Sequence, residues 1–186
     1  MRKSLSVLVA VGLAVTMAVA LAGPAGAKGS PGPKPPPKES KCSKSSVKGI
    51  TYSMDGFLTA NGGAAKTAYV QNGSVLSSII DQTYAAANAA KLIPAGQDTV
   101  AVSLTAQCTG KTTATFKYAL GYKDRATSTT GAALANSAGG AVLVKGHWLI
   151  TPVTVCDLTS LLGMALPGAT YGAQCYQASG LPVPSS

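Results

Sequence analysis

The segment GGAVLVKGHWLITPVTVC, residues 139–156, decides how we expect the C-terminal half of the chain to fold. Within it, the β-prone runs 141–144 and 147–150 flank the pair Lys145-Gly146. Two such runs separated by two residues, the second a glycine able to adopt positive φ, are typical of a tight antiparallel hairpin. We therefore predict two paired strands here, followed by a short helix over 154–162.

Working outward, a hydrophobic period of two marks 99–107 and 113–122, which we predict to be half-buried strands. The first strand is expected to turn one set of side chains toward the core: Val100, Val102, Leu104 and Ala106. The second is expected to do the same with Ala114, Phe116, Tyr118, Leu120 and Tyr122. Between these strands and the hairpin, 123–138 holds polar and small residues, and we predict a long loop.

Earlier in the chain the period changes to about 3.6, which indicates helices. We predict a first helix over 46–60 and a short second one over 64–72, which Gly73 ends. Ser74 is expected to cap a third helix. Helices followed by an antiparallel meander predict an α+β fold, with the N-terminal helices packed on one face of a curved four-stranded sheet and a short C-terminal helix.

The N-terminus has the features of an export signal. Arg2 and Lys3 precede an apolar run over 5–22, and Ala25 and Ala27 occupy the small positions before a cleavage site. We predict a signal peptide over 1–27 and a secreted, extracellular protein, with retention at the cell wall as an option. The alternative is an uncleaved membrane anchor, because the run approaches the ~18 residues that span a bilayer.

Cleavage would leave 159 residues, 186 minus 27, enough for one domain. We divide them into a disordered Lys/Pro-rich tether (28–45), an α+β domain (46–178) and a flexible tail (179–186). The stretch from Lys28 to Lys48 contains six lysines and one acidic residue, so its net charge is +5. It is expected either to touch anionic wall polymers or lipid headgroups or to act as a solubilising spacer. Aromatic residues do not alternate with these lysines, so nucleic-acid binding is not expected.

Four cysteines in an exported chain predict two disulfides rather than a metal or redox site: Cys42, Cys108, Cys156 and Cys175. The predicted meander places Cys108 and Cys156 at opposite ends of a strand, about 17 Å apart, which disfavours that bond. Cys156 with Cys175 would close a short loop and leave Cys42 with Cys108. The pairing of Cys42 with Cys156 and Cys108 with Cys175 stays open.

Several stretches resemble a family of small exported actinobacterial proteins, the low-molecular-weight secreted antigens of mycobacterial type. They are AKTAYVQNG (65–73), TTATFKY (112–118), and GAVLVKGHWLI (140–150) before TVCDL (154–158). The resemblance spans roughly 47–175 and implies a nuclear transport factor 2-like fold, a cone of helices against a bent sheet. It also favours Cys156 with Cys175. Family members often carry Asp-Gly at the hairpin turn where this chain has Lys145-Gly146, and the family offers no catalytic residues to transfer.

The cone fold also hosts enzymes of the ketosteroid isomerase and SnoaL-like types, which need a carboxylate base and a tyrosine in one apolar pocket. Asp55 and Asp81 are the candidate bases, and Tyr118 and Tyr122 the candidate tyrosines. Each has an ordinary structural role available, a solvated helix face or a core position. We therefore expect no enzyme activity and keep the isomerase type as the alternative.

The preferred interpretation is a non-enzymatic binding or interaction protein without a cofactor or metal. Four aromatic residues are candidates to line an apolar ligand pocket: Phe57, Tyr118, Tyr122 and Trp148. The alternative is that they fill the cone. A second option is an envelope protein bound to the polar sheet face, formed by Thr99, Ser103, Thr105, Thr113, Thr115 and Lys117. The single histidine, His147, is expected to be a partly exposed strand residue.

Overall fold

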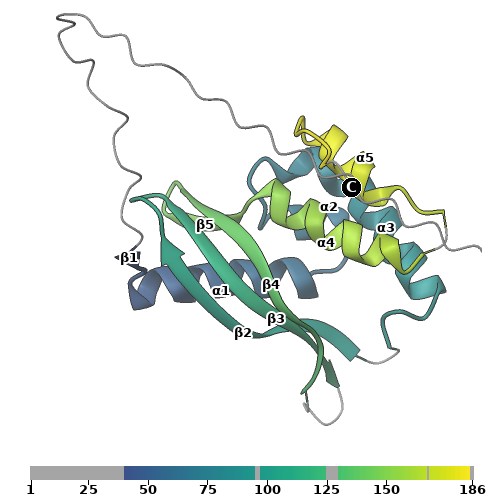
Figure 1. The fold of residues 1–186 in the computed structure, drawn as a ribbon, viewed down its shortest axis with the longest axis horizontal. Helices are drawn as coiled ribbons and strands as arrows, with labels where there is room; N and C mark the ends of the chain where they lie inside the picture. The colour runs from purple at the N-terminus through teal and green to yellow at the C-terminus, as the bar shows by residue number, and fades with distance from the viewer. Residues whose placement is uncertain (1–39, 95–96, 125–129, 167, 185–186) are drawn as a thin grey trace, which may run out of the picture. The chain divides into compact units, whose positions relative to one another are not determined.

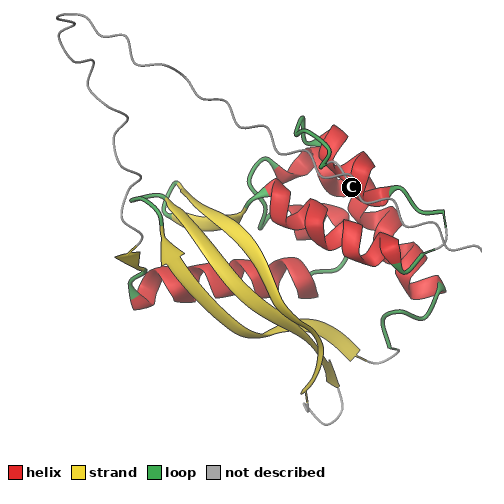
Figure 2. Cartoon of the chain, in the orientation of Figure 1, coloured by secondary structure: helices red, strands yellow, loops and turns green. Residues whose placement is uncertain are grey.

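The structure is a computed structural model that describes residues 40–94, 97–124, 130–166 and 168–184, with side chains left out at 132–136 (Figure 1). The predicted signal peptide and most of the predicted tether lie outside these residues. The described part is mixed α+β, with one antiparallel sheet in the order β1-β2-β3-β4-β5 (Figure 2). Its elements are β1 (Ser40–Lys41), α1 (Lys44–Thr59), α2 (Gly63–Thr67), the 3₁₀ helix η1 (Gly73–Leu76), α3 (Ser77–Ala89), β2 (Gln97–Cys108), β3 (Thr113–Asp124), β4 (Thr130–Val144), β5 (His147–Ile150), α4 (Pro152–Met164) and α5 (Tyr171–Ala178).

The α+β class and the antiparallel sheet are confirmed, but the predicted order of elements is wrong in two respects. The sheet has five strands rather than four, because β1 precedes the helices and pairs with the end of β2. Two helices, α4 and α5, follow the sheet where one was predicted. Residues 40–45, which we assigned to the disordered tether, form β1 and the start of α1.

The hairpin at 141–150 forms as predicted. Val144 is opposite His147, and the two turn residues have positive φ, 50° at Lys145 and 86° at Gly146. Positive φ at both central residues defines a type I′ turn, whose twist matches that of the flanking strands. The turn therefore fixes the β4–β5 register even though lysine is an uncommon residue at its first position.

The predicted loop over 123–138 is wrong at both of its ends. Residues 123–124 end β3, and residues 130–138 belong to β4, which pairs with β3 from Thr113↔Val142 to Lys123↔Thr130. Residues 130–138 are mostly small or polar residues of low β-propensity, and the strand forms here by pairing with β3. Directly after this stretch, a Cβ added at Gly139 would lie 2.6 Å from the Phe116 ring, so a glycine is needed there for close packing.

A β-bulge in β2 changes which of its side chains face the core. The register shifts between Ala101 and Ser103, and Val102, predicted to point inward, is 42% exposed. Beyond the bulge, Leu104 and Ala106 pack against the core as predicted. One extra residue in a strand inverts the alternation on one side of it, which an uninterrupted period of two does not reveal.

Helix α1 lies across one face of the sheet and contacts β2 and β5 (Figure 1). Its first turn is capped by Ser43, whose hydroxyl accepts from the Ser46 backbone N–H at 3.1 Å. The apolar stripe of α1 is buried: Ile50, Met54, Phe57 and Leu58. Ser53 on the same helix donates to the Trp148 carbonyl, which ties α1 to β5.

The segment between α1 and α3 differs in detail from the prediction. Helix α2 ends at Thr67 rather than at residue 72, and Ser74 lies inside η1 instead of capping α3. Asn72 has φ 51°, a left-handed conformation that asparagine tolerates better than most residues. These changes fold the chain back so that α2 and α3 pack against each other.

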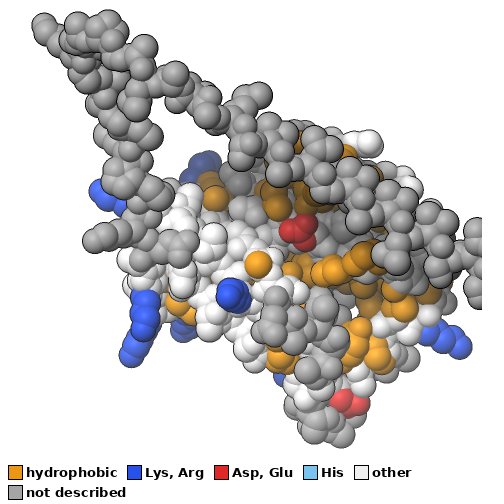
Figure 3. Space-filling view, in the orientation of Figure 1, with side chains coloured by type: hydrophobic (Ala, Val, Ile, Leu, Met, Phe, Trp, Pro, Cys, Tyr) orange, Lys and Arg blue, Asp and Glu red, His pale blue; other side chains and the backbone are white. Residues whose placement is uncertain are grey.

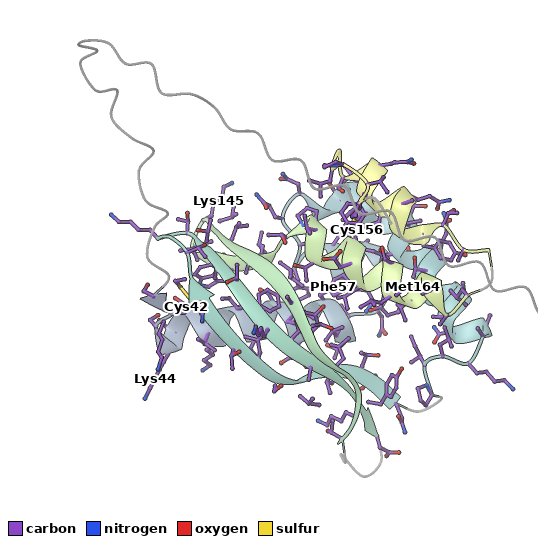
Figure 4. All side chains as sticks on the ribbon, in the orientation of Figure 1. Cys42, Lys44, Phe57, Lys145, Cys156 and Met164 are labelled. Atoms are coloured by element: carbon purple, nitrogen blue, oxygen red, sulfur yellow. A yellow bond between two sulfur atoms is a disulfide. The ribbon has the colours of Figure 1, made fainter. Side chains whose placement is uncertain are left out.

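Two disulfides join the described parts of the chain, and both preferred pairings are confirmed. Cys42 bonds Cys108 with a Cα–Cα distance of 4.9 Å, and Cys156 bonds Cys175 with one of 5.3 Å. The first ties the start of α1 to the end of β2. The second ties α4 to α5, a helix that the hydrophobic periodicity did not predict (Figure 4).

None of the helices that the structure describes combines the length and the apolar character needed to cross a bilayer.

Candidate functional site

Three of the four predicted pocket aromatics are core residues. Phe57, Tyr118 and Trp148 are 1%, 2% and 8% exposed and belong to one buried apolar cluster. Tyr122 is half-buried and lines a cavity, and its hydroxyl donates to the Leu92 carbonyl at 2.9 Å. Trp148 lines a separate groove beside the hairpin. The structure does not bring the four side chains together around one pocket.

The cavity that Tyr122 lines lies at the end of the sheet, where β3 meets α3 and α4. It has a volume of about 320 Å³, at the lower end of the range of ligand pockets. We call it the leucine chamber, and it is lined by Leu58, Tyr84, Leu92, Ile93, Thr99, Leu120, Tyr122, Leu158, Leu161, Leu162 and Ala165. Helix α1 ends at Thr59, and its last turn contributes only Leu58 to this lining. Figure 3 shows hydrophobic side chains gathered along α4 and toward this end of the sheet.

A second cavity, of about 480 Å³, adjoins the leucine chamber. The two share four lining residues: Leu58, Tyr84, Ile93 and Thr99. The rest of the second lining is largely polar, and we call this cavity the polar compartment. Its polar side chains are those of Thr59, Asn61, Lys66, Asp81, Asn88, Gln97 and Asp98.

Lys66 is the buried cation of the polar compartment. Its side chain is 5% exposed, and its ammonium donates to the carbonyls of Phe57 and Leu58, at 2.9 and 2.7 Å. These carbonyls belong to the last turn of α1, where a helix has acceptors without helical partners and a partial negative charge. The ammonium also lies 4.2 Å from the centre of the Tyr84 ring, within cation–π range. Lys66 therefore caps α1 from outside the helix.

Burial lowers the pKa of Lys66 from 10.5 to about 8, and the carboxylates of Asp81 and Asp98 oppose this shift. Asp81 also accepts from the Gly63 backbone N–H at 2.6 Å, which joins the start of α2 to α3. Burial raises the pKa of Tyr84 as well. The polar compartment thus combines one desolvated cation, two carboxylates and a tyrosine that separates it from the leucine chamber.

The sequence did not point to Lys66, because a lysine beside small residues in a short helix has no local signature. Asp81, in contrast, was a predicted candidate and does lie at a cavity. The only signal for Lys66 would have been its position after a helix end, where a cation finds free carbonyls.

Asp55, the other predicted base, lies between α1 and the bulge in β2. Burial raises its pKa, and a hydrogen bond with the Ala101 backbone partly offsets this effect. Its Oδ1 is buried without a hydrogen-bond partner. Asp55 lines neither the leucine chamber nor the polar compartment, so the structure does not place it with Tyr122 in one pocket.

Tyr118, the second candidate tyrosine, belongs to a different polar cluster. Its pKa is raised to about 12, first by burial and then by Asp157. Asp157 on α4 accepts a hydrogen bond from Tyr176 on α5. This Asp157-Tyr176 pair, which the sequence did not predict, joins the same two helices as the second disulfide.

The remaining candidate surfaces lie outside these cavities. The predicted polar sheet face is largely exposed, at Ser103, Thr105, Thr113, Thr115 and Lys117, while Thr99 turns toward the cavities. His147 is exposed beside the hairpin turn, on a groove of about 650 Å³ between this hairpin and α1. Within the described ranges, no group of three His, Cys, Asp or Glu residues is placed to hold a metal ion.

The chain was compared with protein families, curated proteins and solved structures, and none of these comparisons gave a match.

Proposed function

We propose that this chain is an exported, non-enzymatic binding protein that takes a small apolar ligand into the leucine chamber. The observation that carries this proposal is the apolar lining of a cavity of about 320 Å³ to which six leucines and Ile93 contribute beside Tyr84 and Tyr122. A cavity of this kind with few polar groups is typical of small-molecule sites.

The helix that forms one wall supports the proposal further. Leu161 and Leu162 on α4 are only half-buried although they are large apolar side chains. Covering apolar surface contributes about 25 cal/mol per Å², so a ligand seated against these two side chains would gain binding free energy from their burial.

Export and fold family belong to the same proposal. The N-terminal signal features, two disulfides and the resemblance to low-molecular-weight secreted antigens support a secreted protein. The helices beside a bent antiparallel sheet are compatible with a nuclear transport factor 2-like cone, whose concave end would correspond to the leucine chamber.

The test fills the chamber without disturbing the rest of the fold. Ala165 lines the chamber at the end of α4, whereas its neighbour Met164 is 77% exposed and does not line it (Figure 4). We expect Ala165→Trp to abolish binding of decanol, followed by calorimetry and by native mass spectrometry of the secreted protein. Met164→Trp is the matched control and should bind normally. Equal binding by both variants, or none by the unmodified protein, would contradict the proposal.

The alternative function is an isomerase-type enzyme, and one observation favours it. Asp55 is a carboxylate with a raised pKa, which is a property of general bases. Asp55→Asn would abolish turnover of a ketosteroid-type substrate if this alternative held. No turnover by the unmodified protein would remove it.

A second candidate partner is an envelope protein on the polar sheet face. Its uncharged hydroxyl-bearing side chains and Lys117 form an exposed surface on β2 and β3. The substitutions Thr105→Glu and Thr115→Glu should then reduce capture from envelope extracts while leaving decanol binding intact. Residues 28–39, which lie outside the described residues, remain proposed as a basic contact to anionic wall polymers.

A further inference from the structure

We propose that the leucine chamber and the polar compartment form one site for a single-chain amphiphile with an uncharged, hydroxyl-rich headgroup. This inference rests on the proposed function, because it assigns the chamber to the hydrocarbon chain of the ligand. It adds the chemistry of the other end of the ligand.

The two cavities adjoin along a shared wall. Leu58, Tyr84, Ile93 and Thr99 line both, so the end of a ligand in the chamber would lie next to the polar compartment at these residues. Tyr84 has its ring against Lys66 on the polar side and contributes to the apolar lining on the other. The lining thus changes from apolar to polar across one side chain.

The chamber itself selects for hydrocarbon. None of its lining residues is charged, and the Tyr122 hydroxyl already donates to the Leu92 carbonyl. A charged group placed in it would lose its hydration without gaining a partner, which is costly. The charged or polar end of a ligand therefore belongs in the polar compartment.

Lys66 does not offer that compartment a ready anion site. Its ammonium has three hydrogens, two of which are donated to the Phe57 and Leu58 carbonyls, while the ring of Tyr84 lies against the same group. The compartment also contains the carboxylates of Asp81 and Asp98. An anionic headgroup would face two like charges near one cation that is already engaged.

A cationic headgroup is disfavoured for the converse reason. It would compete with Lys66 for the same two carboxylates and would lie close to a buried ammonium that its hydrogen bonds hold in place. Like charges juxtaposed at a site are a common source of specificity against a ligand.

Hydroxyl groups suit the lining better than either ion. A hydroxyl donates to a carboxylate and accepts from an amide, and the compartment offers both kinds of group. The carboxylates are those of Asp81 and Asp98, and the amides are those of Asn61, Asn88 and Gln97. A glycerol-like headgroup on a medium-length chain matches this set.

The experiment compares three ligands that share a chain and differ in the headgroup. Monodecanoylglycerol, decanoic acid and decyltrimethylammonium are titrated into the secreted protein at pH 7.5, below their aggregation concentrations, with calorimetry as the readout. We expect the glyceride to bind at least about tenfold more tightly than either ion, since one unfavourable charge contact of about 1.4 kcal/mol suffices for that ratio. A tighter complex with either ion would overturn the inference.

The two proposals fail in different ways. If none of the three ligands binds, the chamber is not a ligand site and the proposed function fails. If they bind, and Ala165→Trp abolishes binding, but an ion is preferred, only the headgroup assignment fails.

Two substitutions test whether residues of the polar compartment determine which headgroup is preferred. Asp81→Asn keeps an oxygen for the Gly63 N–H and removes one negative charge, so decanoate should bind several-fold more tightly while the glyceride changes less than twofold. Asn88→Ala should weaken the glyceride several-fold, whereas Gln82→Ala on the same helix, outside the lining, should not. Equal effects of Asn88→Ala and Gln82→Ala would contradict the assignment.

A measurement on the unmodified protein covers the case in which Asp81→Asn does not fold. Raising the salt concentration screens repulsion between carboxylates. Decanoate binding should then strengthen relative to glyceride binding. A constant ratio would show that charge repulsion does not exclude the anion.

Discussion

The two ends of the sheet differ in how fully helices cover the side chains that point inward from the strands. At the filled end, around Phe57, Phe116 and Trp148, helix α1 lies across the sheet and its side chains are buried among those of β3 and β5. At the hollow end, around Tyr122 and Leu161, α1 has already ended and only parts of α3 and α4 face the strand. The alternation of buried and exposed side chains along β3 is regular from Thr113 to Tyr118 and breaks at Leu120 and Gly121, where the pairing with β4 shifts register. The end of α1 and this irregularity coincide where inward side chains become cavity walls.

The largest expected effect contrasts one residue from each end. Phe57→Ala should cost about 4 kcal/mol of unfolding free energy, because it leaves a cavity among fully buried neighbours. Leu161→Ala should cost only about 1 kcal/mol, because the side chain is half-buried and already borders empty space. Urea denaturation of both variants measures the difference. Similar losses would show that the two ends are equally well packed.

The disulfides provide the next contrast, since each one fastens a different part of the fold. Cys42–Cys108 closes 66 residues and Cys156–Cys175 closes 19, so chain entropy alone predicts losses of about 4 and about 3 kcal/mol on removal. The α4–α5 pair is also fully buried, which adds a packing loss when both cysteines become alanine. We expect the Cys156→Ala/Cys175→Ala variant to lose decanol binding as well, because α4 forms a chamber wall. Retained binding would show that α4 stays in place without the bond.

A pH titration of stability examines the boundary between the two ends, where Lys66 lies. The lysine has a folded-state pKa of about 8 against 10.5 when unfolded, so the unfolded chain holds more protons between these values and stability should rise with pH there. Tyr118 and Tyr176 have pKa values raised from 10 to about 12, so their contribution is lost as the pH rises above 10. The melting temperature should therefore increase from pH 8 and decline above pH 10.

Lys66→Met should abolish the rising part of this profile. Lys117→Met, on the exposed sheet face, is the control and should leave the profile unchanged. A rising limb that survives Lys66→Met would assign the effect to another group.

The sequence predicted more of the filled end than of the hollow end. The stripe of α1, most of the inward side of β3 and the β4–β5 hairpin follow from local periodicity and turn chemistry. Reach disfavoured one cysteine pair, and the family resemblance favoured the disulfide pairing that the structure shows. The bulge at Val102, the strand at 130–138 and α5 were missed, because each depends on contacts between distant segments. The cavities were missed for the same reason: Leu92, Ile93, Leu161 and Leu162 come together only where several elements end. Hydrophobic periodicity identifies the faces of helices and strands that will point inward. It does not show whether those faces pack closely against one another or leave a cavity between them.

The smallest expected effect concerns Asp55, which carries the one buried side-chain atom without a partner among the described residues. Its pKa is raised above 3.8, so the folded chain binds its proton more readily and stability falls as the pH rises through the window just above that value. Asp55→Asn removes the charge and should stabilise the protein at neutral pH by less than about 1 kcal/mol, since the side chain is partly exposed. The gain should shrink as the pH approaches 3.8, where the carboxyl group of the unmodified protein becomes neutral. Thermal unfolding at pH 7 and pH 4 measures both values. A gain in stability that is equal at the two pH values would show that burial of the Asp55 charge does not destabilise the fold. The contact between α1 and the β2 bulge would then be as favourable as the packing in the rest of the filled end.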